Sequence, residues 1–298
     1  MHKTTLIFSC ICILLASVVG LVVSYLVRES GVSVGVEGGS SIVLGLPGIE
    51  PKEQRSTMTA TSAILFDTEN KTILFQEKAF ERRPLASITK LMTAMVALDH
   101  GMDWEQEANI LPSEYGIGGE LILHPGETAS MRDLFTASLL GSANNATTAY
   151  VRQMDIPQDE FVREMNRKAI ALGLEQTEFT DVTGLSPENV STAYEIAILA
   201  HHAFSQYPDI ARTSSQKEYV FAMRGSGREH TIRNTNKLIQ AGHMEATGSK
   251  TGFLYEAGYC LVMQGAGKYA TRIAVVLNDI SEEAQFADIQ KLLTMQIK

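Results

Sequence analysis

Cysteine is scarce in this chain, which contains 3 in 298 residues. Cys10 and Cys12 share one apolar segment, so Cys260 has no partner for an internal disulfide in the rest of the chain. Its neighbours in "AGYCLVM" are apolar, which favours a small buried side chain with a raised thiol pKa. We therefore do not expect cysteine chemistry to carry the function.

Positive charge is also in short supply. The chain has 25 lysines and arginines against 34 aspartates and glutamates, a net charge of -9. Phosphate binding requires a basic face, so nucleic acid is not the expected partner. The 7 histidines form no His-Glu-x-x-His pair, and the sequence indicates neither a metal site nor a cofactor.

The N-terminal segment lacks charge altogether between residues 4 and 27. It is long enough to cross a hydrocarbon core of about 30 Å as a helix. A cleavable secretory signal is one interpretation. An uncleaved anchor is the other, and the length favours it, because signal cores usually run about 7–15 residues. We therefore predict an anchor or signal at 1–27, a flexible Gly- and Ser-rich linker at 28–57, and an exported catalytic domain at 58–298.

Short apolar or alternating runs predict strands near both ends of this domain. "TSAILFD" and "KTILFQ" are separated by "TEN", "AGYCLVMQ" and "RIAVVLND" are joined by "GAGKYAT", and "KEYVFAM" predicts a further strand. Helical periodicity occurs at 88–98, 132–140 and 192–204 and again in the tail from residue 282 to 296. This pattern predicts an α+β fold in which the two ends of the chain share one antiparallel sheet around a mainly helical centre.

Ser87 and Lys90 begin "ASITKLMTAMVAL", a predicted helix with apolar side chains on every face. Residues three apart share a helix face, so the two side chains should meet. Burial lowers the pKa of a lysine, which turns it into a usable base. A helix-initiating serine with a lysine that reaches the surface is an equally good interpretation of this segment alone. A second Ser-x-x-Lys, Ser214 and Lys217, lies in polar "TSSQKEYV", where we expect a solvated surface.

Two further motifs carry polar groups next to apolar runs. Ser142 and Asn144 occur in "LLGSANNATTAY", where helix capping is the simpler interpretation and proton relay with substrate binding is the alternative. Lys250, Thr251 and Gly252 lie at the edge of a predicted strand. They offer a positive charge, a hydroxyl and a backbone that a ligand can approach closely. An exposed turn is the alternative, but the combination suits a substrate that ends in a carboxylate.

The three motifs stand in the order Ser-x-x-Lys, Ser-x-Asn, Lys-Thr-Gly. With the surrounding strings "AILFDTENKTILFQEKAFERRPLASITKLMTA", "GETASMRDLFTASLLGSANNA" and "GSKTGFLYEAGYCLV", the chain resembles the serine-type D-alanyl-D-alanine carboxypeptidases, the low-molecular-mass penicillin-binding proteins. The resemblance runs from about Thr59 to the C-terminus. It implies the fold shared by β-lactamases and penicillin-binding-protein transpeptidases. It also implies a bacterial enzyme on the extracytoplasmic side of the cytoplasmic membrane, anchored by a single N-terminal span or secreted if that segment is cleaved.

The resemblance implies the catalytic roles. Ser87 would attack the carbonyl of the penultimate D-alanine of a peptidoglycan stem peptide, with Lys90 as its general base. Ser142 would pass the proton to the leaving D-alanine, and water would then hydrolyse the acyl-enzyme. β-Lactams would acylate Ser87 and leave slowly.

The resemblance also implies how the substrate is held. Asn144 would hydrogen-bond the bound peptide, and Lys250 and Thr251 would hold the terminal carboxylate, with Gly252 beside them. The backbone N–H of Phe253, together with that of the nucleophile, would form the oxyanion hole.

Two positions depart from the family pattern: Leu254 stands where a hydroxyl residue is common, and Glu195 where an aspartate is more usual. A DD-endopeptidase, which cleaves cross-links with the same residues, is an alternative. A class A β-lactamase is another, but its Glu-x-x-Leu-Asn loop is missing between the second and third motifs. The alternative of another class is an inactive wall-binding scaffold, against which the intact Ser87 and Lys90 argue.

Overall fold

The computed structural model divides the chain into two compact units, Met1–Arg55 and Ser56–Lys298. It describes residues 34–35, 43–44, 58–116, 118–242, 245–266 and 271–296. In the first unit, β1 (Val34–Gly35) pairs antiparallel with β2 (Val43–Leu44), a pairing that the prediction of a flexible linker did not include. The predicted membrane segment lies outside the described residues. Within the described ranges, no helix has the length and apolar character needed to cross a membrane.

A five-stranded antiparallel sheet forms the centre of the second unit, in the order β11-β12-β13-β3-β4. Its strands are β3 (Ser62–Asp67), β4 (Thr72–Glu77), β11 (Ala246–Leu254), β12 (Gly258–Ala266) and β13 (Thr271–Asp279). β13 pairs with β3, so that Val275 lies opposite Ile64. The prediction that the two ends of the domain share one sheet is therefore confirmed, as are the hairpins β3-β4 and β12-β13.

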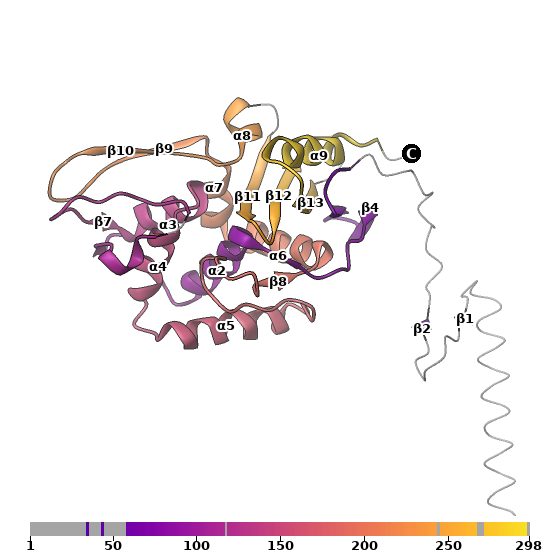
Figure 1. Ribbon diagram of the computed structural model, residues 1–298, viewed down its shortest axis with the longest axis horizontal. Coiled ribbons are helices and arrows are strands. Elements are labelled where there is room, and N and C mark those ends of the chain that lie inside the picture. Colours follow the sequence, from indigo (N-terminus) through magenta and orange to yellow (C-terminus); the bar gives the residue numbers. More distant parts are fainter. Residues whose placement is uncertain are drawn as a thin grey trace, which may run out of the picture. The chain divides into compact units, whose positions relative to one another are not determined.

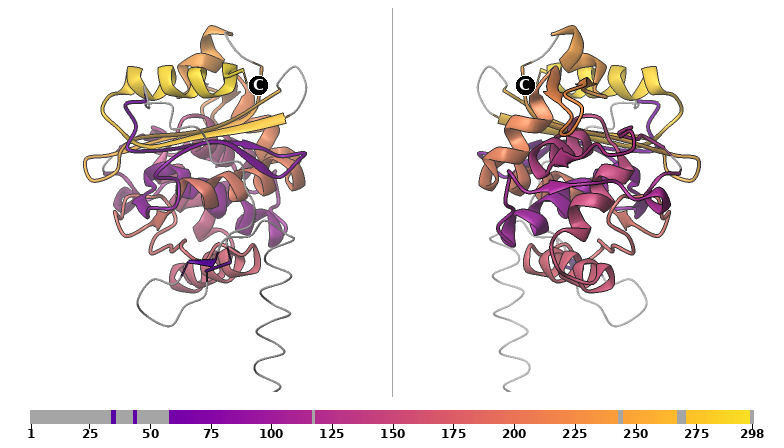
Figure 2. Two further views of the ribbon diagram at one scale, coloured as in Figure 1. Left: turned by 90° about the vertical axis from the view of Figure 1, so that its right-hand side faces the viewer. Right: turned by 90° about the vertical axis from the view of Figure 1, so that its left-hand side faces the viewer.

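Helices cover both faces of the sheet, which Figure 2 shows edge-on. α8 (Lys237–Ala241) and α9 (Glu282–Thr294) pack on one face, and a larger core fills the space between the other face and the remaining helices. On β13, Val276 faces α9 whereas Val275 faces the larger core. Because both faces are buried, these strands appear in the sequence as unbroken apolar runs.

The remaining elements lie on the side of the larger core (Figure 1). The helices are η1 (Ala86–Thr89), α2 (Lys90–Asp99), η2 (Pro112–Glu114), α3 (Met131–Leu140), α4 (Asn144–Arg152), α5 (Gln158–Ala171), α6 (Ala193–Gln206) and α7 (Pro208–Ser215). The short strands are β5 (Arg83–Pro84), β6 (Glu107–Ala108), β7 (Ala129–Ser130), β8 (Val190–Ser191), β9 (Glu218–Ala222) and β10 (Glu229–Arg233). β9 pairs with β10 in a hairpin separate from the main sheet.

The second Ser-x-x-Lys pair is not the solvated surface that the sequence predicted. Ser214 is buried in α7, where its hydroxyl accepts a hydrogen bond from the backbone N–H of Ser249 on β11. Lys217 lies outside the helix and is exposed. The prediction failed for the serine because α7 packs directly on β11, a long-range contact that the polar local sequence does not reveal.

Cys260 agrees with its prediction. It is fully buried on β12, and burial raises the pKa of its thiol to about 12.

Candidate active site

Ser87 lies on η1, a single 3₁₀ turn that leads into α2. The sequence predicted one α-helix through both residues, and the structure corrects this. In a 3₁₀ turn residues three apart are eclipsed, which brings the side chains closer than an α-helix would. Lys90 Nζ lies 2.8 Å from Ser87 Oγ. Ala86, just before Ser87, has a φ of 46°, a conformation that non-glycine residues rarely adopt and that is common near functional sites.

Lys90 is fully buried, and its side-chain nitrogen has three hydrogen-bond partners. Besides Ser87 Oγ, Nζ lies 2.7 Å from Asn144 Oδ1 and 2.7 Å from the carbonyl oxygen of Thr183. The amide oxygen and the carbonyl oxygen can only accept hydrogen bonds. A neutral amine has two N–H groups and one lone pair, so both N–H groups go to these acceptors and the lone pair is left facing the Ser87 hydroxyl.

Burial holds the pKa of Lys90 well below its usual value, and the charge of Lys250 lowers it further. The Asp181 carboxylate opposes this effect without cancelling it. Lys90 therefore has both the geometry and the lowered proton affinity of a general base.

Asp181 also shapes the loop that supplies the carbonyl of Thr183. Its carboxylate accepts hydrogen bonds from the backbone N–H groups of Thr183 at 2.5 Å, Gly184 at 2.6 Å and Ser186 at 2.5 Å. This loop could not be predicted from the sequence, because Thr183 contributes through its backbone oxygen. Its only signal in the sequence is the string "DVTGLS".

Ser142 and Asn144 lie at the junction of α3 and α4. The N-cap of α4 is Ala143, without a side-chain cap, so neither residue has the capping role that the sequence alone favoured. The Asn144 oxygen instead accepts from Lys90, and Ser142 Oγ accepts from Lys250 Nζ at 2.9 Å. Ser142 adopts a φ of 59°, a second rare conformation at the site.

Lys250 is 2% exposed on β11, and burial lowers its pKa to about 7. Its ammonium also donates to the carbonyl of Thr251 at 2.9 Å. The Thr251 hydroxyl lies 2.5 Å from that of Thr235, a residue that was not among the predicted site residues. The lysine is thus buried in the site and is not the exposed residue of a turn.

Gly252 and Gly184 permit close backbone contacts on two sides of η1. A Cβ on Gly252 would lie 3.0 Å from the backbone nitrogen of Ser87, and one on Gly184 would lie 1.9 Å from the carbonyl oxygen of Ala86. The reason predicted for Gly252 was the approach of a ligand, whereas the structure shows that η1 itself makes the close approach. The two glycines allow η1 to pack closely between β11 and the loop of Asp181.

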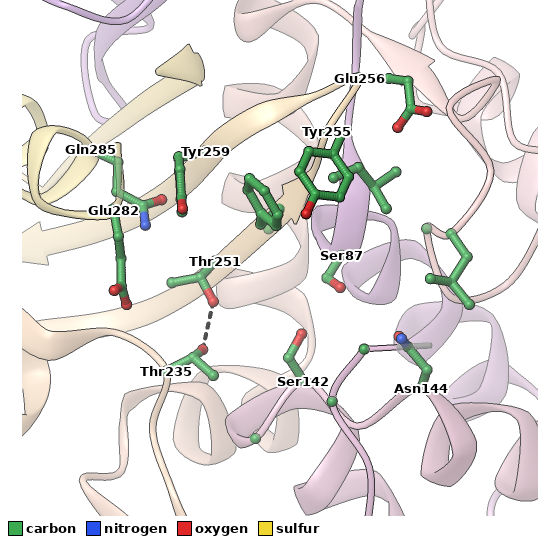
Figure 3. A pocket seen from close by; sticks show the side chains of 18 residues that line it. Ser87, Ser142, Asn144, Thr235, Thr251, Tyr255, Glu256, Tyr259, Glu282 and Gln285 are labelled. Atoms are coloured by element: carbon green, nitrogen blue, oxygen red, sulfur yellow. Dashed lines mark hydrogen bonds between the residues drawn. The ribbon is translucent and has the colours of Figure 1, made fainter. Parts of the chain in front are cut away.

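A cavity of about 720 Å³ opens over these groups. Its lining includes Ser87, Ser142, Asn144, Thr235 and Thr251, and Figure 3 shows their side chains around one space. Phe253 is 44% exposed at its rim and packs against Tyr259 with ring centroids 4.4 Å apart; Leu254 also lines the cavity. In the described part of the chain, no three His, Cys, Asp or Glu side chains gather as a metal site would require.

Residues 49–281 match the family model described as D-alanyl-D-alanine carboxypeptidase. The chain belongs to this family. Among its relatives, the D-alanyl-D-alanine endopeptidase of Pseudomonas aeruginosa is 35% identical over 237 residues, which cover 79% of this chain and 76% of the relative. The D-alanyl-D-alanine carboxypeptidase DacF of Bacillus subtilis is 31% identical over 242 residues, 78% of this chain and 61% of DacF.

The structure is also similar to a crystal structure of penicillin-binding protein D2 from Listeria monocytogenes in its cefotaxime-bound form. The TM-score is 0.70 at 29% identity, over 79% of this chain and 96% of that one. The predicted α+β transpeptidase-like fold is confirmed. As a member of the family, the protein is a serine-type D-Ala-D-Ala carboxypeptidase, a peptidase that acts on the cell wall.

Proposed function

We propose that the protein removes the terminal D-alanine from peptidoglycan stem peptides through an acyl-enzyme on Ser87. The observation that carries this proposal is the placement of Lys90, whose amine lies 2.8 Å from Ser87 Oγ and whose other two contacts are acceptors. Lys90 takes the hydroxyl proton as Ser87 Oγ bonds to the carbonyl carbon of the penultimate D-alanine. The C–N bond then breaks, and water later hydrolyses the ester.

Ser142 and Lys250 serve the leaving group in this proposal. The 2.9 Å contact between them places a hydroxyl next to a buried ammonium. Ser142 relays to the departing amine the proton that Lys90 took from Ser87, while Lys250 and the Thr251–Thr235 pair hold the terminal carboxylate. Asn144 binds the peptide and Lys90.

The oxyanion hole in this proposal consists of two backbone N–H groups, those of Ser87 and Phe253. β11 is the edge strand of the sheet, so every second N–H group points away from β12. The outward N–H of Ser249 donates to Ser214 Oγ, and the strand period of two turns the N–H of Phe253, four residues on, to the same side for the oxyanion. Gly252 allows η1 to come close enough for both N–H groups to face one oxygen.

β-Lactams are proposed to acylate the same serine. The cefotaxime-bound form of the similar Listeria protein supports this. We also propose that residues 1–27 form a single membrane span or a cleaved signal, that 28–57 link it to the catalytic domain at 58–298, and that this domain works outside the cytoplasmic membrane. The uncharged stretch between residues 4 and 27 supports the span.

The test uses the full chain in membranes or detergent. Fluorescent penicillin should label the wild type, and a peptide ending in D-Ala-D-Ala should release D-alanine. Ser87→Ala should abolish both, and Lys90→Met should lower both by about 100-fold or more, the usual contribution of a general base. Lys217→Met, in the other Ser-x-x-Lys pair, is the matched control and should retain full activity. No labelling of the wild type would refute an active serine enzyme, and rapid release of the label would favour a β-lactamase.

A DD-endopeptidase is the second candidate. The 35% identical Pseudomonas relative carries that name, and the cavity is longer than a terminal D-alanine requires, because it reaches helix α9.

A further inference from the structure

The cavity does not end at the residues proposed to hold the terminal carboxylate. Its lining continues to Tyr259 on β12 and to Glu282 and Gln285 on α9. In Figure 3, Thr251 and Thr235 lie between Ser87 on one side and the α9 pair on the other. None of the roles assigned above uses this arm of the cavity.

Gln285 carries an unsatisfied polar group in this arm. The residue is 3% exposed, and its side-chain Oε1 has no hydrogen-bond partner among the described residues. Figure 3 shows its amide end turned toward Tyr259 and the interior of the cavity. Buried amides are almost always hydrogen-bonded, so an unpaired one at the wall of a cavity indicates a partner that arrives with the ligand.

Glu282 is fixed one helical turn before Gln285. Its Oε2 accepts from Lys237 Nζ at 2.7 Å, a contact that ties α9 to α8. Its side chain is 41% exposed and also lines the cavity. The carboxylate and the amide oxygen both accept hydrogen bonds, so the arm suits a ligand that donates N–H groups.

A departing D-alanine cannot use these acceptors, because its side chain is a methyl group. A leaving residue with a long side chain that bears an amide N–H can reach beyond the carboxylate-binding threonines. The acceptor residue of a cross-linked peptide has this chemistry: its released end carries a carboxylate, and its side chain continues into the second peptide.

We propose that Gln285, supported by Glu282, forms a leaving-group subsite that binds an amide N–H on the side chain of the released residue, so that the enzyme selects cross-linked peptides. The proposal rests on the proposed acylation of Ser87. The scissile amide is cleaved as before: the acyl group passes to Ser87, the amine leaves with one added proton, and water restores the serine.

Three synthetic peptides test this subsite. They are identical up to the penultimate D-alanine and end in D-alanine, D-norleucine or Nε-acetyl-D-lysine. Norleucine matches the alkyl chain without the N–H donor. We expect the wild type to cleave the acetyl-lysine peptide with a kcat/KM about fivefold above that of the norleucine peptide, the effect of one hydrogen bond.

Gln285→Leu should bring this ratio to about one while leaving kcat/KM for the D-alanine peptide within about twofold. Gln290→Leu, an exposed position on the same helix, is the matched control and should keep the wild-type ratio. Glu282→Ala should lower the ratio and provides a second variant if Gln285→Leu fails to fold, as judged by penicillin labelling.

A wild-type ratio near one, or a ratio that survives both Gln285→Leu and Glu282→Ala, would overturn the subsite. These outcomes differ from failure of the proposed function, in which the wild type takes no penicillin label and releases nothing from any of the three peptides.

Discussion

Asn144→Asp tests the assignment of Lys90 as the base, because it changes charge without changing shape. Asn144 Oδ1 now accepts from Lys90 Nζ at 2.7 Å. Two opposite charges at 2.7 Å attract by about 6 kcal/mol at an effective dielectric constant of about 20, which corresponds to about 4 pKa units. Asn144 is 8% exposed, so desolvation of the new carboxylate opposes this gain. Close ion pairs shift a pKa by about 1–3 units, and we expect a rise of about 2 units for Lys90.

The expected consequence is a shifted pH profile for acylation. Below the raised pKa of Lys90, each unit reduces the neutral fraction of this lysine tenfold, so the rate on the acid side should fall about 100-fold. The assay is the second-order rate of labelling by fluorescent penicillin as a function of pH. Asn144→Leu, which removes the acceptor without adding charge, should slow the reaction. It should not move the acid limb, the part of the pH–rate profile where the rate falls as the pH is lowered, to higher pH. An acid limb that stays in place in Asn144→Asp, with a uniformly lower rate, would refute the role of Lys90 as the base.

Three further predictions follow from the contacts of η1 and β11. Gly252→Ala should slow penicillin labelling by about tenfold at nearly unchanged thermal stability. The reason is that the new Cβ would lie 3.0 Å from the Ser87 nitrogen and displace Ser87 slightly. An unchanged labelling rate would contradict the close contact. Asp181→Asn should shift the acid side of the pH–rate profile of labelling to lower pH, because it removes the charge that raises the pKa of Lys90. It should also lower the Tm, because the loop loses hydrogen bonds. A shift of the profile to higher pH would contradict this prediction. Because burial lowers the pKa of Lys250 to about 7, kcat/KM for carboxylate-ended peptides should fall as the pH rises above about 7. The matching C-terminal methyl esters should not show this decrease. Identical pH profiles for the two kinds of peptide would argue against a carboxylate held by Lys250.

The apolar runs and the motif spacing predicted more of this protein than any single residue did. Strands buried on both faces leave an unmistakable signature, so β3, β12 and β13 could be read from sequence. The Ser87–Lys90 contact was also predictable, because any right-handed helical turn brings residues three apart together.

Groups that act through the backbone or through long-range packing could not be predicted. The Thr183 carbonyl reaches Lys90 only because Asp181 folds its loop, and side-chain identity says nothing about a carbonyl. Ser214 was misjudged for the same reason: its burial depends on β11, which is far away in sequence. Gln285 left no local signal at all, since it is one glutamine in a helix and becomes notable only beside the cavity.

The pairing of β13 with β3 has a consequence for the time at which the enzyme becomes reactive. Ser87 and Lys90 are synthesised early, but β11, with Lys250 and Gly252, is among the last segments to be made. Closing such distant contacts is slow, and the sheet cannot assemble before its C-terminal strands are present. Until then Lys90 lacks the burial and the neighbouring charge that lower its proton affinity. We therefore expect Ser87 to remain inert along the unfinished chain and to become reactive only once the C-terminal strands have closed the sheet.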